Sequence, residues 1–228
     1  SLLLAGLDAK TIRQELHEFL VDRKGNGSEG ERSDQTRTFV VNNLMKIWGS
    51  PDSELIPFRD ASLAFLRENP SMALAVHWGM ISAVYPFWFN VARQTGRLLA
   101  LQHQVSQTQI INRLKEQYGD RQTVSRYARF VIRSFVAWEV LKDSQAKGCY
   151  EKAVPMSITE PNLAVLMFES AILATPEAKG TLGLLLNNPA FFPFQLPVMT
   201  GDSVSLRSDR IDVVRYGLDD ELLRLKGN

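Results

Sequence analysis

The sequence predicts a mainly α-helical protein with small β-hairpins, and three observations support this fold class. Apolar residues recur at the three- and four-residue spacings of amphipathic helices over most of the chain. Capping residues open these segments, and Gly, Asn or Pro end them. Period-two segments are short and lie in the second half. The 228 residues are 45% hydrophobic and 22% charged, which is a globular composition and excludes collagen-like, disordered and disulfide-rich proteins.

Residues 1–92 are predicted to form an N-terminal helical region. Asp8 is placed to cap a first helix, in which Ile12, Leu16, Phe19 and Leu20 share one face. Further helices are expected over about 35–48 and 58–68, followed by an apolar helix capped by Ser71. This region shows no pattern typical of catalysis or ligand binding.

The apolar helix belongs to a stretch of 24 residues without a formal charge, between Glu68 and Arg93. A stretch of this length is sufficient to span a bilayer. Polar residues are spread through it, and Pro86 interrupts a helix near its far end. These features favour a buried core helix, with a membrane span as the alternative, and we expect no membrane partner.

Two helices joined by a glycine turn are predicted in the middle of the chain. The first begins at Ser106, with Gln109 three positions later as in a capping box, and ends at Gly119. The second follows over about 121–138. This order is typical of a helix-turn-helix.

A β-hairpin is predicted after the second helix. Residues 140–142 and 149–154 form two apolar-rich segments around a polar turn that contains Lys147. Helix, turn, helix and hairpin in this order indicate a winged helix-turn-helix over residues 93–154.

The second helix carries two stripes on different faces. The first is apolar and is predicted to face the core, whereas the second is basic and is predicted to enter a DNA major groove. The apolar stripe is Val124, Ala128, Val131, Phe135 and Trp138, and the basic stripe is Gln122, Arg126, Arg129 and Arg133, with Ser125 beside it.

Positive charge is concentrated in this part of the chain. Residues 93–152 hold 11 basic and 5 acidic side chains, a balance of +6, whereas the whole chain carries +1. Such asymmetry is expected of a nucleic-acid contact surface. The alternatives are a solvated face and a surface that meets an acidic protein. The residues predicted to contact phosphates are Arg113, Lys115, Arg121, Lys142, Lys147 and Lys152.

Residues 155–228 are predicted to form a C-terminal module of helices and strands; the alternative is that all three regions form one compact unit. One helix opens at Thr159–Pro161 and another covers about 175–186. Strands over 196–199, 203–207 and 211–215 would complete a possible second winged-helix-like module. Lys179 is the single base in its candidate reading helix, so we expect this module to pack or to bind protein. The acidic run 219–221 is expected to cap a terminal helix.

The chemistry-bearing residues do not predict an enzyme. The histidines are His17, His77 and His103, none at metal-ligand spacing from another, and Cys149 is the single cysteine. No nucleophile, phosphate-loop or zinc-protease motif is present. We therefore assign no catalytic residue, metal ligand or cofactor. One cysteine cannot form an internal disulfide, which favours a cytoplasmic protein.

Several residues of the middle and the end of the chain resemble the BrxA family of BREX phage-defence systems. They are Arg113-Leu114-Lys115, the Gly119 turn, Thr123-Val124-x-Arg126, Trp138, and the ending Gly217-Leu218-Asp219-Asp220-Glu221. The resemblance implies a mostly helical, winged-helix protein that binds double-stranded DNA without enzymatic activity. It also implies an antiviral role beside other BREX proteins, such as a methyltransferase, an ATPase and a phosphatase-like protein.

Overall fold

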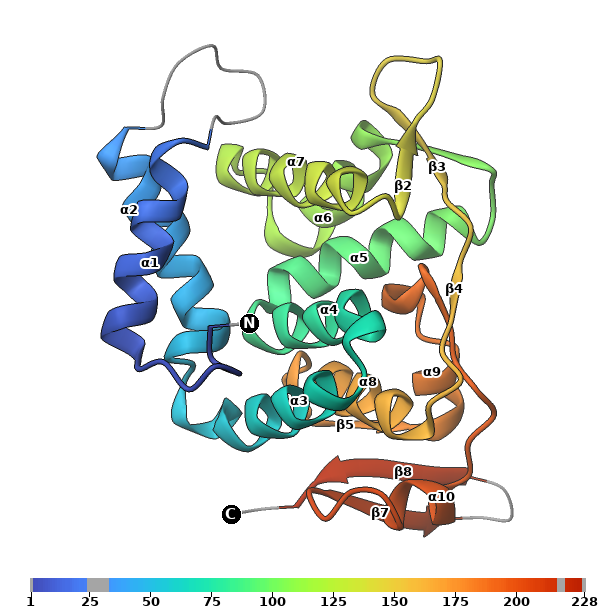
Figure 1. Cartoon of the computed structure of the whole chain (residues 1–228). Coiled ribbons are helices and arrows are strands. Elements are labelled where there is room, and N and C mark those ends of the chain that lie inside the picture. The colour runs from blue at the N-terminus through green and yellow to red at the C-terminus, as the bar shows by residue number, and fades with distance from the viewer. Residues whose placement is uncertain (1, 24–32, 217–219, 227–228) are drawn as a thin grey trace. The chain divides into compact units, whose positions relative to one another are not determined.

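The computed structural model describes residues 2–23, 33–216 and 220–226. In this part of the chain, ten α-helices and three small sheets confirm the mainly helical class (Figure 1). The chain divides into two compact units, Ser1–Ser71 and Met72–Asn228. The divisions expected after residues 92 and 154 both fall inside the second unit. Residues 217–219, on which part of the expected family resemblance rests, lie outside the described residues.

Three α-helices lie among the described residues of the first unit. Asp8 caps the first of them as expected, because its Oδ1 accepts hydrogen bonds from the N–H groups of Lys10 at 2.8 Å and Thr11 at 3.1 Å. The helices are α1 (Ala9–Val21), α2 (Asp34–Leu44), which continues as the π-helix η1 (Met45–Gly49), and α3 (Ile56–Glu68), which follows the 3₁₀ turn η2 (Ser53–Leu55).

A small apolar cluster joins α1, α2 and η1 in this unit. Its buried members are Ile12, Leu20, Val41 and Met45. Phe19 was expected on the buried face of α1, but it is 59% exposed. The reason is that Ile12, Leu16 and Leu20 follow a four-residue spacing, which leaves Phe19 beside this face.

The charge-free stretch forms two helices, α4 (Ala73–Val84) and α5 (Pro86–Leu99). Ser71 does not cap α4 as expected, because Pro70–Met72 form a 3₁₀ turn, η3, before the helix begins. Among the described helices, none alone has the length and apolar character needed to cross a membrane. Pro70–Val84 and Pro86–Leu99 meet these criteria only as a pair, bent by 119°.

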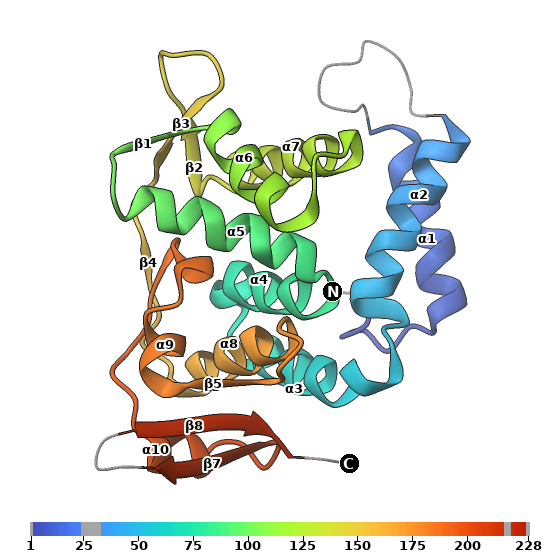
Figure 2. The same ribbon diagram turned by 180° about the vertical axis from the view of Figure 1, so that it is seen from behind.

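The next elements form a small antiparallel sheet with two helices inserted between its first two strands. The sheet order is β1-β3-β2, and Val105 of β1 lies opposite Tyr150 of β3. The two helices lie against α5, next to the sheet (Figures 1 and 2). These elements are β1 (Gln104–Ser106), α6 (Gln107–Tyr118), α7 (Gln122–Ala137), β2 (Leu141–Asp143) and β3 (Cys149–Lys152).

The capping box expected at the start of α6 is confirmed. Gln109 N–H donates to Ser106 Oγ at 3.1 Å, and Ser106 N–H donates to Gln109 Oε1 at 2.8 Å. Gly119 ends the helix with a positive φ of 83°, a backbone conformation that favours glycine. The cap and the glycine together position the turn between α6 and α7.

The C-terminal elements repeat this strand order. The three-stranded antiparallel sheet β5-β8-β7 places its first strand beside its last, as in β1-β3-β2. A two-stranded parallel sheet joins β4 to β6. The elements are β4 (Met156–Ser157), α8 (Pro161–Leu173), β5 (Lys179–Thr181), α9 (Leu182–Leu186), η4 (Pro189–Phe191), β6 (Phe194–Gln195), α10 (Gly201–Ser205), β7 (Ile211–Tyr216) and β8 (Asp220–Leu225).

Several C-terminal predictions were wrong in detail. The helix expected over 175–186 is a turn, the strand β5 and the short α9, because residues 179–181 pair with β8. Residues 203–205 belong to α10 and not to a strand, whereas the strand expected over 211–215 is confirmed as β7. Glu221 does not cap a terminal helix: it lies in β8 and accepts a hydrogen bond from Gly201 N–H at 2.6 Å.

Trp78 of α4 lies at the centre of the second unit and is fully buried. Its ring centroid lies 4.6 Å from that of Trp88, 5.1 Å from Phe135 and 5.6 Å from Phe192. Its Nε1 donates to the carbonyl oxygen of Ala190 at 3.1 Å. One aromatic core therefore joins α4, α5 and α7 to the segment around η4.

An ion pair holds α8 to the segment before β7. The carboxylate of Glu169 is 2% exposed, and it accepts hydrogen bonds from Arg210 Nε at 2.7 Å and Nη2 at 2.8 Å. We expect Glu169→Gln to lower the free energy of unfolding by about 3 kcal/mol, because this change breaks a buried, bidentate pair. Urea unfolding followed by circular dichroism measures this change.

Asp212→Asn is the matched control, since Asp212 also accepts two hydrogen bonds from one guanidinium, that of Arg224. This pair is exposed, with side chains 37% and 56% accessible, so its loss should change the free energy of unfolding by less than about 1 kcal/mol. An equal loss of unfolding free energy in Glu169→Gln and Asp212→Asn would contradict a larger contribution from the buried pair.

Candidate nucleic-acid interface

The buried side of α7 faces the aromatic core. Val131 and Trp138, which were expected in this seam, are only half-buried, and Ile132 is buried instead. The buried residues recur every three or four positions, so they stay on one side of the helix and leave the opposite side open. They are Val124, Ala128, Ile132 and Phe135.

The open side of α7 carries the basic stripe. Gln122, Arg126, Arg129 and Arg133 are all exposed, and Ser125 at its edge is half-buried. The helix contains no acidic residue. Among the described residues, neither Arg126 nor Arg129 forms an ion pair, so both guanidinium groups are available to an anionic ligand.

Arg133 is placed differently from the other two arginines. Its Nη1 donates to both carboxylate oxygens of Asp143, at 2.7 and 2.9 Å. The hydrogen bond that Arg133 donates to Asp143 raises the pKa of Arg133. Arg133 therefore joins α7 to β2, and Asp143 partly compensates its charge.

The basic residues of α6 are also paired. Arg113 Nη1 lies 3.7 Å from Glu116 Oε2, and Lys115 Nζ lies 2.7 Å from Asp120 Oδ1. Arg121, which is exposed immediately before α7, has no ion pair among the described residues. Arg113, Lys115 and Arg121 were all expected to contact phosphate. Arg121 is the one of these three whose charge is not compensated by a described acidic residue.

The hairpin presents three exposed lysines. Lys142 lies on β2, Lys147 in the turn between β2 and β3, and Lys152 at the end of β3. None of them forms an ion pair within the described ranges. The bond between Arg133 and Asp143 holds this hairpin against α7, so the lysines and the α7 arginines belong to one connected substructure.

The first turn of α7 has no side-chain cap, unlike that of α6. Its N-cap residue, Arg121, makes no capping hydrogen bond, and the first turn contains no acidic residue. The first amides of a helix lack partners within it, and the helix dipole adds partial positive charge there. This end of α7 is therefore suited to a phosphate group.

The sequence analysis missed two exposed aromatic residues beside the basic stripe. Tyr127 is 44% exposed and Phe130 is 57% exposed, and their ring centroids lie 6.2 Å apart. The guanidinium carbon of Arg126 lies 5.7 Å from the centre of the Phe130 ring. The sequence did contain a signal for them, because at helical spacing neither residue falls in the apolar seam of α7.

The eleven residues predicted at this surface lie on α6, on α7 or immediately before it, or in the hairpin, but they are not equivalent. Arg121, Arg126, Arg129, Lys142, Lys147 and Lys152 are exposed without an ion pair in the described structure, whereas Arg113, Lys115 and Arg133 pair with acids. No protein-family model, curated protein or solved structure matches the chain. The interpretation of the surface therefore rests on its own residues.

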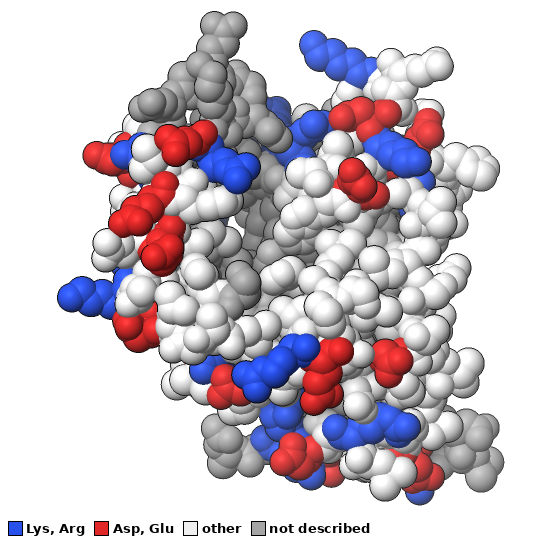
Figure 3. Space-filling view, in the orientation of Figure 1, with Lys and Arg blue, Asp and Glu red and all other residues white. Residues whose placement is uncertain are grey.

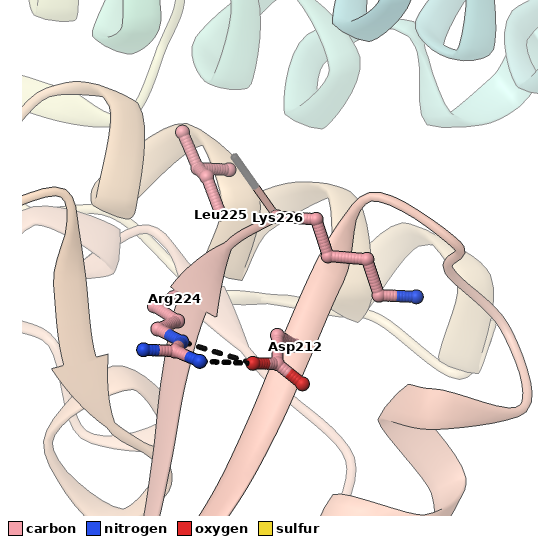
Figure 4. Close-up of a pocket in the computed structure, with 4 residues that line it drawn as sticks. All are labelled: Asp212, Arg224, Leu225 and Lys226. Atoms are coloured by element: carbon pink, nitrogen blue, oxygen red, sulfur yellow. Dashed lines mark hydrogen bonds and ion pairs between the residues drawn. The ribbon is translucent and has the colours of Figure 1, made fainter. Parts of the chain in front are cut away.

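Charge elsewhere is mixed. On the face shown in Figure 3, lysine and arginine side chains are interspersed with aspartate and glutamate. A pocket of 510 Å³ at the end of the C-terminal sheet is lined by Asp212, Arg224, Leu225 and Lys226. Figure 4 shows Arg224 directed at Asp212, and the Lys226 side chain extending away from this pair. The pocket thus contains an ion pair that joins β7 to β8.

The histidines are not gathered into a site. In the part of the chain that the structure describes, no group of three or more His, Cys, Asp or Glu residues is placed to hold a metal ion. Burial of the ring lowers the pKa of His77, which favours the neutral imidazole in the folded protein. This is the behaviour of a histidine packed within a core helix.

Proposed function

We propose that this protein is a non-enzymatic accessory protein that binds double-stranded DNA. The observation that carries the proposal is the open side of α7, where Arg126 and Arg129 are exposed on a helix without acidic residues. Arg121 and the hairpin lysines Lys142 and Lys147 extend this charge to both sides.

The order of the elements supports a winged helix-turn-helix. A helix, α5, precedes the strand β1, the helices α6 and α7, and the hairpin β2–β3, and the first strand pairs with the last. In such a module, the second helix of the pair enters the major groove and the hairpin contacts the DNA backbone. We assign α7 and β2–β3 to these roles.

We also propose the biological setting that the BrxA resemblance implies. The protein would act in phage defence in the cytoplasm, beside other BREX components. Its chemistry there would be limited to DNA binding. The C-terminal elements, whose arginines Arg210, Arg215 and Arg224 pair with acids of the same chain, would serve packing or protein contacts.

The test is fluorescence anisotropy with a labelled duplex of about 30 base pairs over roughly 50 to 200 mM salt. Five phosphate contacts predict a slope of about −4.5 for the logarithm of the association constant against that of the salt concentration. We expect the double variant Arg126→Ala, Arg129→Ala to bind at least about 30-fold more weakly, with a shallower slope. Arg133 is left intact because it holds the hairpin to α7.

The matched control is the double variant Arg67→Ala, Arg207→Ala, which removes two exposed arginines from elsewhere in the chain. Its affinity should equal that of the parent, since neither residue lies on α6, α7 or the hairpin. Circular dichroism tests whether both double variants are folded. The proposal fails when the parent does not bind at low salt, or when the two doubles bind equally well.

The second candidate function is a protein–protein scaffold. The observation that favours it is a set of exposed apolar side chains among the C-terminal elements: Leu184 at 71%, Val198 at 95% and Leu206 at 84%. Copurification of a partner by a protein that does not bind DNA at any salt concentration would favour the scaffold.

A further inference from the structure

Two aromatic side chains lie next to the arginines on the open side of α7. Tyr127 and Phe130 are three residues apart, and their rings meet at 72° with centroids 6.2 Å apart. The rings meet edge to face, so the edge of one lies against part of the face of the other. At 44% and 57% exposure, both rings remain accessible.

These aromatic residues are not required by the packing of the helix. At 3.6 residues per turn, Phe130 lies about 140° around the helix from the buried Phe135. Burying Phe135 therefore accounts for the helix packing and leaves Phe130 directed away from the core. An exposed phenyl ring gains little hydrophobic stabilisation from the fold, so its position on α7 is not explained by core packing.

The side chains around the two rings indicate that the ligand is a polyanion that carries flat apolar groups. Arg126 lies over the Phe130 ring at 5.7 Å, Arg129 is exposed three positions further along α7, and the helix carries no acidic residue. Cationic side chains with exposed aromatic rings are typical of surfaces on which unpaired bases stack. Phe130 has no donor or acceptor to read a base edge in a duplex, whereas every unstacked base offers a face that its ring can cover.

We infer that Tyr127 and Phe130 stack on unpaired bases, so that α7 binds a duplex most tightly where base pairing is interrupted. The inference rests on the DNA-binding function proposed above and specifies its preferred substrate. The arginines contact the phosphates beside the interruption, and the two rings hold the released bases. A base enters the stack without forming or breaking a covalent bond.

The test compares a labelled duplex of about 30 base pairs with the same duplex carrying about five mismatched, unpaired positions at its centre. At one salt concentration, the parent should bind the interrupted duplex about tenfold more tightly. The double variant Tyr127→Leu, Phe130→Leu keeps apolar side chains but loses the aromatic faces. It should bind both duplexes with the affinity of the parent for the intact one.

A base analogue reports stacking directly. 2-Aminopurine at an unpaired position should lose fluorescence when the parent binds, and keep it with the leucine double variant at saturating protein. The control Phe19→Leu, Phe39→Leu changes two equally exposed aromatic side chains on α1 and α2, 59% and 53% accessible. This control should preserve both the tenfold preference and the quenching.

The outcomes separate the inference from the function on which it rests. Salt-sensitive binding with equal affinity for both duplexes overturns the inference and leaves the proposed function intact. The inference is also overturned, with the proposed function intact, when the variant Tyr127→Leu, Phe130→Leu retains the full preference for the interrupted duplex. Leucine has no aromatic face on which a base can stack, so such a preference would have another cause. Absence of binding to either duplex overturns both, and a partner protein then becomes the occupant to test.

Discussion

Replacing Gly96 with alanine should lower the free energy of unfolding by about 3 kcal/mol or more. A Cβ at Gly96 on α5 would lie 1.8 Å from the carbonyl oxygen of Pro189 and 2.7 Å from its carbonyl carbon. It would also lie 3.0 Å from the Cβ of Phe192. The closest atoms belong to backbone, which has no rotamer with which to move aside, so α5 and η4 must separate.

Gly183→Ala on α9 is the matched control for this prediction. Nothing lies within 4 Å of the Cβ that it adds, and its φ is not positive. We expect a change of less than about 1 kcal/mol, because alanine restricts the unfolded chain more than glycine and meets no atom in the folded one. Urea unfolding followed by circular dichroism compares the two variants. Similar midpoints for Gly96→Ala and the parent would contradict the close contact between α5 and η4.

Trp78→Ala should destabilise the second unit by about 4 kcal/mol, the range found for removing a fully buried large aromatic side chain. The change leaves a cavity among Trp88, Phe135 and Phe192, whose ring centroids all lie within 5.6 Å of the Trp78 ring. It also removes the N–H donor to the Ala190 carbonyl oxygen. The midpoint of urea unfolding, with the m-value held to that of the parent, gives this change.

Trp78→Phe separates the cost of the cavity from the cost of the lost hydrogen bond to Ala190. Phenylalanine keeps an aromatic ring in the core but leaves the carbonyl of Ala190 without its donor. We expect the free energy of unfolding to fall by about 2 kcal/mol, to a value between those of the parent and the alanine variant. A loss of less than about 1 kcal/mol for Trp78→Ala would contradict the central position of this side chain, because cavities of this size are not tolerated at so small a cost.

Both predictions concern the contact that joins the candidate DNA surface to the C-terminal elements. Gly96 and Trp78 hold the segment around η4, and Trp78 also contacts Phe135 on the buried side of α7. We therefore expect DNA binding to be lost in parallel with folding when either residue is changed. The contact explains why residues 72–228 form one compact unit and not two separate modules.

The local signals of the middle region were readable from the sequence. The capping box at Ser106 and Gln109, the glycine turn at Gly119 and the hairpin after α7 all occur where the spacing indicated. These features depend on residues within a few positions of one another, so neighbouring side chains decide them. The stripe of arginines followed from the same helical periodicity, and the structure confirms that its members are exposed.

The sequence did not reveal which of these charges remain available. Arg133 pairs with Asp143 ten positions away, after a helix end and the start of a strand, and helical periodicity contains no information on that contact. The strand β5 was taken for part of a helix because its partner, β8, lies more than forty residues later. Glu169 and Arg210 are likewise separated by 41 positions.

The helical class, the caps and turns of the middle region, and the two faces of α7 follow from local sequence patterns. Three features depend on the folded chain: the aromatic core that the C-terminal elements share with α7, the pairing of β5 as a strand, and the ion pair by which Arg133 holds the hairpin. The difference lies in the range of the interactions. Caps and helical faces arise from neighbours within one or two turns, whereas strand pairing, ion pairs and core packing join residues that only the folded chain brings together.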